Sequence, residues 1–159
     1  MPGHLDERGG VRMIDVSDKS ATLRTASASG TLKLMPSQLD ALATGDIKKG
    51  DWRTTAQIAG IQGAKHCALL VPLCHPVPLE HVDVTVELVP GRPVVGVRCT
   101  ATCTGKTGVE MEALSGTCAA LLCVYDMIKG IDKGAQIGSI VLEEKTGGRS
   151  GDWRRSDSD

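Results

Sequence analysis

The stretch Gly105–Glu112, which reads Gly-Lys-Thr-Gly-Val-Glu-Met-Glu, combines an anion-binding signature with two carboxylates. Lys106 and Thr107 precede a predicted helix, whose N-terminal amides and dipole favour a negative charge. A Walker phosphate loop would also require glycine at position 100, where this chain has Thr100. The stretch therefore favours a nucleotide-handling enzyme over a simple binding module and excludes an ATPase of the Walker type.

The two carboxylates of this stretch differ in the direction that a helix would give them. If both residues are helical, Glu110 and Glu112 point about 200° apart, so only one of them can face a site; if the chain is still extended there, they share a face. We expect Glu112 to be that residue, because Glu110 shares its side with the apolar Leu114 and Cys118. An ordinary alternative stays open, since acidic residues in the first turn stabilise any helix.

A second candidate is His75 in the run Pro72–Pro76, where prolines on both sides restrict the backbone. Histidine exchanges protons near neutral pH and can hydrogen-bond a base or a phosphate. We expect His75 to be functional, although a loop histidine with a purely structural role fits the same pattern.

A third candidate is Asp126 with Lys129 near the end of the same helix, three residues apart and able to touch. On spacing alone the ordinary exposed ion pair is favoured, and an acid beside a lysine can also serve as a proton-transfer couple once a site is enclosed. Glu112 and Asp126 are fourteen residues apart, which places them roughly 21 Å from each other along one helix. If both are catalytic, the active site lies between subunits of a homo-oligomer.

Scattered lysines near glycine-rich turns could bind a polyphosphate, namely Lys48-Lys49 before a predicted helix, Lys65 on it and Lys145 before a Gly-rich tail. The chain as a whole has a net charge of −1, so no global field recruits nucleic acid or a membrane. Two Trp, one Tyr and no Phe also argue against base stacking.

The six cysteines include no Cys-x-x-Cys pair, which favours buried thiols and predicts no metal site. We expect a cytoplasmic protein, because residues 1–12 are charged and Gly-rich rather than apolar and no run suggests a membrane span.

Hydrophobic periodicity and turn residues predict an α+β domain of residues 13–152, between a flexible segment 1–12 and a flexible tail 153–159. Alternating apolar residues in 80–89 and 94–104 predict two half-buried antiparallel strands, with Thr and Arg on their polar face. The other expected elements are strands at 13–16, 22–34 and 137–144, and helices at 36–44, 51–70 and 109–129. We expect Gly45 to end the first of these helices and Asp51 to cap the second. This order is the ferredoxin-like plan, an antiparallel sheet with helices on one face.

Several of these segments, taken together and in order, resemble the cyclic pyranopterin monophosphate synthase family of molybdenum cofactor biosynthesis. The resemblance runs from about Met13 to Asp152 and is carried by Lys49-Gly50-Asp51, Ala56–Ile61, Pro72–Pro76, Thr104–Leu114, Tyr125-Asp126-Met127 and Lys145–Gly151. Two departures are His66, where the family pattern suggests Arg, and Trp52-Arg53 after the Gly-Asp pair.

The resemblance implies a lyase that converts 3',8-cyclo-7,8-dihydroguanosine 5'-triphosphate to cyclic pyranopterin monophosphate and diphosphate. It also implies a homohexamer built from dimers, with sites at the dimer interface. No cofactor is certain, although Mg²⁺ could accompany the triphosphate. By the same resemblance Asp126 is the catalytic acid or base, Lys129 is its partner, and the substrate-binding residues are Leu73, Cys74, His75, Met111, Glu112, Lys49, Lys65 and Lys145.

Two other functions remain open on the sequence alone. One is a different nucleotide-triphosphate cyclase or pterin-forming enzyme, and the other is a ferredoxin-like binding or assembly module. A pure binding module would have no need of Asp126 or Lys129.

Overall fold

A single antiparallel sheet forms one layer of the protein in the computed structural model, which describes residues 4–6 and 8–156. Its strands are β1 (Thr22–Lys33), β2 (His81–Leu88), β3 (Val94–Gly105), β4 (Gln136–Thr146) and the short β5 (Trp153–Arg154). They are ordered β2-β3-β1-β4-β5, so the two long strands β3 and β1 lie at the centre. The parts of the predicted flexible ends at 1–3, 7 and 157–159 lie outside the described residues.

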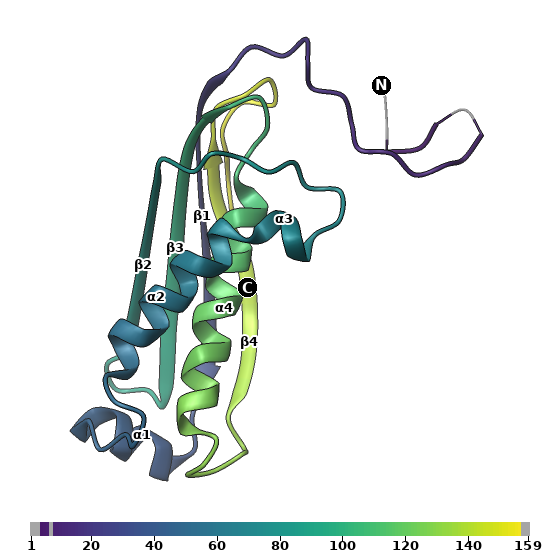
Figure 1. The fold of residues 1–159 in the computed structure, drawn as a ribbon. Helices are drawn as coiled ribbons and strands as arrows, with labels where there is room; N and C mark the ends of the chain where they lie inside the picture. The colour runs from purple at the N-terminus through teal and green to yellow at the C-terminus, as the bar shows by residue number, and fades with distance from the viewer. Residues whose placement is uncertain (1–3, 7, 157–159) are drawn as a thin grey trace.

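The helices cover one face of this sheet (Figure 1). They are α1 (Pro36–Thr44), α2 (Trp52–Lys65), the single turn α3 (Cys67–Leu70) and the long α4 (Glu110–Ile128). α2 packs mainly against α4, and α4 packs against β1, β3 and β4. The α+β class is confirmed, and this strand order with helices on one face follows the ferredoxin-like plan.

The alternating pattern of the hairpin strands places their apolar side chains under the helices as predicted. Val84 and Val86 of β2 are buried, whereas Asp83 and Thr85, which alternate with them, are exposed. The alternate residues of β3 from Val95 to Cys103 are at most 3% exposed. On the opposite face Arg98 and Thr100 donate hydrogen bonds to the hydroxyl of Ser27, which makes this face polar.

Glycines allow α2 and α4 to approach each other closely. A Cβ atom on Gly116 would lie 2.5 Å from the Cys99 sulfur and 3.0 Å from the Gly60 carbonyl oxygen. A Cβ atom on Gly63 would lie 2.8 Å from the Ser115 carbonyl oxygen. Side chains at these positions would therefore push the two helices apart.

Trp52 fixes the start of α2 against α1. Its side chain is 3% exposed, its indole nitrogen donates to the Leu42 carbonyl oxygen at 3.2 Å, and the Arg53 guanidinium lies 4.5 Å from its ring centroid. Trp52 is thus a core residue with a satisfied polar group. Asp51 caps the helix as predicted by accepting the backbone N–H groups of Arg53 and Thr54.

Three elements differ from the sequence predictions. The predicted strand at 13–16 is wrong: the segment pairs with no strand of the sheet, and β3 and β4 already occupy both edges of β1, the next strand along the chain. The predicted helix 51–70 breaks at His66, and the break turns Cys67 into the core while Leu69 and Leu70 remain exposed. The predicted tail contains β5, which pairs with β4 at Glu144 and Lys145.

α4 is also long and apolar enough to cross a membrane by composition alone. Half of its apolar window is buried inside this fold, and the core helix of a water-soluble domain passes the same test.

Candidate active site

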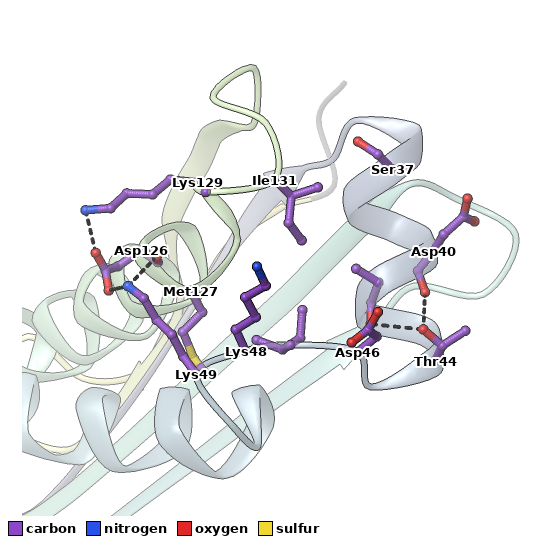
Figure 2. A pocket seen from close by; sticks show the side chains of 13 residues that line it. Ser37, Asp40, Thr44, Asp46, Lys48, Lys49, Asp126, Met127, Lys129 and Ile131 are labelled. Carbon is purple, nitrogen blue, oxygen red and sulfur yellow. Dashed lines mark hydrogen bonds and ion pairs between the residues drawn. The ribbon is translucent and has the colours of Figure 1, made fainter.

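A carboxylate held by two lysines lies at the C-terminal end of α4 (Figure 2). The Lys49 ammonium is 2.5 Å from Asp126 Oδ2 and donates to the Asp126 backbone carbonyl oxygen at 2.9 Å. The Lys129 ammonium is 2.6 Å from Asp126 Oδ1. All three side chains are about half exposed, so a ligand can reach them. The predicted Asp126–Lys129 contact is confirmed, and Lys49 completes it from a distant part of the chain.

Local backbone geometry brings Lys49 to this position. Gly45 ends α1 with a φ of 76°, as predicted, and Gly50 has a φ of 92° just before the cap of α2. Both are left-handed conformations that glycine adopts without strain, so the chain can turn twice within six residues. The fully buried Gln38 accepts the Met35 N–H and donates to the Asp132 carbonyl oxygen, which ties α1 to the loop after α4.

Hydrogen bonds from the lysines determine the protonation state of this cluster. The bond from Lys129, followed by the bond from Lys49, lowers the pKa of Asp126 to about 2. The same contact with Asp126 raises the pKa of Lys129. Asp126 and Lys129 are therefore both charged at neutral pH. The arrangement can attract an anion, and it holds Lys129 in one orientation.

This cluster borders a cavity of about 680 Å³ between α1 and the end of α4, large enough for a nucleotide. Lys48 extends into the space between them (Figure 2). The residues that line the cavity are Ser37, Asp40, Ala41, Thr44, Asp46, Ile47, Lys48, Lys49, Asp126, Met127, Lys129, Gly130 and Ile131. Sequence reasoning did not select the α1 residues of this wall, because they are common surface types without a motif.

A second group of predicted residues gathers at the N-terminal end of α4. The loop before β2 brings Leu73, Cys74 and His75 against the first turn of α4, where they line a cavity of about 210 Å³. Met111 and Glu112 line the same cavity, so this part of the predicted site is brought together. Glu110 also lines it. Both residues are helical, so the expectation that only one of the two carboxylates faces the site is wrong; the Glu110 carboxylate lies beside Gly108 in the loop before the helix.

Glu112 is the most unusual side chain of this second group. It is 4% exposed, and burial raises its pKa above the usual range. The Cys67 thiol hydrogen-bonds to Glu112, and burial raises the pKa of Cys67 to about 12, so this thiol remains a protonated donor. A carboxyl group in such surroundings keeps its proton to a higher pH than an exposed glutamate and can transfer it to a reacting atom. Sequence reasoning missed Cys67, which resembled an ordinary buried thiol.

The remaining predicted lysines lie apart from both groups or at their margin. Lys65 lines a small cavity of about 50 Å³ that also borders Cys67 and Glu112. Lys145 lies on β4 and donates hydrogen bonds to Ser150 Oγ and the Gly151 carbonyl oxygen, so it orders the turn before β5. Within this chain, Lys145 lines neither the 680 Å³ cavity nor the 210 Å³ cavity. Lys106 donates to the Ser17 carbonyl oxygen at 2.6 Å.

The two groups lie at opposite ends of α4, and fourteen residues of helix separate Glu112 from Asp126 by roughly 21 Å. One chain therefore does not bring the predicted residues into one site. Among the described residues, no three His, Cys, Asp or Glu side chains are grouped closely enough to hold a metal ion.

Comparison with known proteins adds independent information. The family model described as "MoaC family" matches residues 13–148. A Mycobacterium tuberculosis H37Rv protein named "Cyclic pyranopterin monophosphate synthase 1" is 50% identical over 157 residues, covering 98% of this chain and 91% of the relative. A Roseiflexus protein (strain RS-1) named "Cyclic pyranopterin monophosphate synthase" is 51% identical over 150 residues, covering 94% of this chain and 95% of the relative. This chain belongs to the MoaC family.

Proposed function

We propose that this protein is a cyclic pyranopterin monophosphate synthase, a phosphorus–oxygen lyase of molybdenum cofactor biosynthesis. It would convert 3',8-cyclo-7,8-dihydroguanosine 5'-triphosphate to cyclic pyranopterin monophosphate and diphosphate. The observation that carries the proposal is the cluster of Lys49, Asp126 and Lys129 beside a nucleotide-sized cavity. The names of the relatives support the same activity.

The proposed reaction needs no oxidant or reductant. The guanine-derived skeleton rearranges to a pyranopterin through proton transfers, and a ribose-derived hydroxyl attacks the α-phosphorus. A new P–O bond closes the cyclic phosphate, the bond to the β-phosphate breaks, and the hydroxyl proton is lost. Every step thus needs either a proton carrier or a stabiliser of negative charge.

Lys129 is the best placed proton carrier of the first cluster. Because the pKa of Asp126 is held at about 2, its carboxylate is a weak base, and we assign it to orienting Lys129 and Lys49. Lys48 and Lys49 supply positive charge for the departing diphosphate. Both Asp126 oxygens accept hydrogen bonds from lysines, so a Mg²⁺ ion that arrives with the triphosphate would be held by phosphate oxygens rather than by Asp126.

The cavity around Glu112 suits the ring end of the substrate. Carboxylates such as Glu110 and Glu112 accept hydrogen bonds from the N–H groups that a guanine-derived ring presents. His75 in the same cavity can donate to a ring or phosphate oxygen. With Leu73, Cys74 and Met111 these residues form the substrate-binding wall of our proposal, and Lys65 lies at its margin.

We also propose that each active site combines the Glu112 end of one subunit with the Asp126 end of a neighbour. The separation of roughly 21 Å within one chain supports this arrangement, because a single substrate does not span it. A homohexamer built from dimers would provide such interfaces, and the cytoplasm is the location that we expect for an enzyme acting on a GTP derivative.

Turnover of the cyclised GTP derivative tests the proposed function directly. The wild-type protein should release diphosphate and the cyclic phosphate product in equal amounts, and Asp126→Asn should lower the formation of both by about 10³-fold, no more than the loss of Lys129, while substrate binding persists. Binding without turnover by the wild-type protein would instead favour a binding module.

A mixing experiment tests the shared site. Asp126→Asn and Glu112→Gln are expected to be nearly inactive alone. When their subunits are exchanged at a 1:1 ratio, about one quarter of the sites should contain both native carboxyl groups and regain activity. No regain despite demonstrated exchange, or a fully active monomer, would rule out sites between subunits.

A further inference from the structure

Lys106 is engaged with protein in this structure, although its motif favoured an anion. Its ammonium donates to the Ser17 carbonyl oxygen at 2.6 Å. Hydrogen bonds from Ser17 lower the pKa of the nearby Asp15, and the charge of Lys106 adds to this effect. The lysine therefore connects the loop after β3 to the segment that precedes β1.

That segment, residues 4–6 and 8–21, extends away from the sheet, and we call it the N-terminal arm (Figure 1). Among the described residues, the bond from Lys106 is the only hydrogen bond between the arm and the rest of the chain. Within the arm, the Ser17 N–H donates to Asp15 Oδ1 and the Lys19 N–H donates to the Val16 carbonyl oxygen. These turns give the backbone around Ser17 a defined shape, and Lys106 fixes that shape relative to the domain.

The turns place the arm against the cavity that is lined by the buried Glu112. Ile14, Val16 and Lys19 of the arm line the same 210 Å³ cavity as His75 and Glu112. The arm is thus one wall of that cavity, opposite the first turn of α4.

Lys19 changes the charge of this wall. Of the residues that line the cavity, it is the only Lys or Arg, and it lies with the two acidic residues Glu110 and Glu112. An ammonium group placed there can donate to a substrate oxygen and offset the two carboxyl groups. An anionic nucleotide would otherwise meet only negative or neutral groups in this cavity, apart from any protonated histidine.

We propose that Lys19 contacts the substrate and that Lys106 is a positioning residue, which holds Lys19 in the cavity through the Ser17 carbonyl group. This inference rests on the proposed function and adds two residues to its site. It predicts that the two lysines act in series.

A double-mutant cycle tests that prediction. Lys19→Gln should raise KM for the cyclised GTP derivative about 10-fold with a small change in kcat, because one charge-assisted hydrogen bond is lost. Lys106→Gln should raise KM by a similar factor. The double variant should be no worse than Lys19→Gln alone, because Lys106 acts through Lys19. Lys19→Arg should restore part of the loss, and Lys33→Gln at the exposed end of β1 serves as the matched control.

Hydrogen exchange of the arm provides a readout that does not depend on turnover. In the free protein, peptides covering residues 13–20 should exchange faster in Lys106→Gln and at the wild-type rate in Lys19→Gln. Unchanged exchange in Lys106→Gln, additive losses in the double variant, or wild-type kinetics in Lys19→Gln would each overturn the proposal. If the wild-type protein itself shows no turnover, the proposed function fails, and the exchange data still decide whether Lys106 holds the arm.

Discussion

The two ends of α4 carry the same functional group in opposite surroundings. At the N-terminal end, Glu112 is 4% exposed, and its protein hydrogen-bond donors include a thiol but no lysine. At the C-terminal end, the Asp126 side chain is about half exposed and receives hydrogen bonds from two ammonium groups. Burial raises the pKa of the first group, and the lysines lower the pKa of the second to about 2.

This difference shows that a carboxyl group takes its role from its surroundings rather than from its position in a motif. Glu112 can hold and deliver a proton, whereas Asp126 remains an anion that orients cations. One rigid helix keeps the two roles apart, and the five predictions below test this division from the largest expected effect to the smallest.

The largest effect should come from the cation that Asp126 orients. Lys129→Gln should lower kcat about 10³-fold, since it removes both a proton carrier and a positive charge from the cluster. Steady-state product formation measures the loss, and Lys133→Gln in the following loop is the control. If Asp126→Asn were far more damaging than Lys129→Gln, Asp126 itself would be the proton carrier.

Glu112→Gln should lower kcat/KM by about 10²-fold, because the amide cannot transfer a proton. Its effect on stability has a definite sign. Burial raises the Glu112 pKa above 4.5, so the folded protein binds the proton more tightly than the unfolded chain. The wild-type free energy of unfolding should therefore fall as the pH rises from 4.5 through the folded pKa.

The Glu112→Gln variant lacks this pH-dependent contribution to the free energy of unfolding. Its stability relative to wild type should be greatest above the folded pKa of Glu112 and should decline as the pH approaches 4.5. Denaturant unfolding at a series of pH values measures the difference. A gap that does not change with pH would show that folding does not raise the Glu112 pKa.

A change in the middle of α4 should affect both ends together. Gly116→Ala places a methyl group against the Cys99 sulfur and the Gly60 carbonyl oxygen, and should lower the free energy of unfolding by about 1–3 kcal/mol. Gly130→Ala, where an added Cβ meets no neighbouring atom, is the matched control. Equal stability of the two variants would mean that the contact between α2 and α4 has room for a methyl group at position 116.

Removal of the Cys67 thiol next to Glu112 should change kcat/KM by a few-fold. Cys67→Ala deletes a hydrogen bond that lowers the Glu112 pKa, so that pKa should rise further. Cys67→Ser keeps a donor and should stay close to wild type. The pH dependence of kcat/KM distinguishes the two variants, and identical profiles for both would remove Cys67 from the site.

Lys145→Ala should have the smallest effect, a rise in KM of about two-fold to three-fold. Lys145 already bonds the turn before β5 and lines neither large cavity of its own chain. A much larger rise in KM without loss of stability would place Lys145 in the site of a neighbouring subunit.

Regular local patterns made most of the fold predictable. The alternation in 80–89 and 94–104 identified β2 and β3, and the Asp51 cap and Gly45 stop located helix ends within a residue. The arm was not predictable in this way, because the apolar residues at 13–16 resemble a short strand. Only the folded sheet shows that both edges of β1 are already paired, with β3 and β4. β5 was missed because two residues are too short to show a period.

The site was predictable as a set of residues but not as an arrangement. Spacing predicted the contact of Asp126 with Lys129 and their separation from Glu112, whereas the family resemblance made them candidate site residues. The contact of Lys49 with Asp126 joins residues 77 positions apart and depends on two glycine turns. Neither the burial of Glu112 nor the bond from Lys106 to the arm leaves a local signal, because each is created by packing between distant segments.

The sparse aromatic content has a practical spectroscopic consequence. The chain has two tryptophans and one tyrosine, and Trp52 is buried beside α1 while Trp153 is 43% exposed on β5. A Trp153→Phe variant would leave a single indole, three residues from Lys49 and covered by the Arg53 guanidinium. The emission of that one fluorophore would report on ligand occupancy at the lysine end of α4, so binding and turnover could be followed separately in the same cuvette.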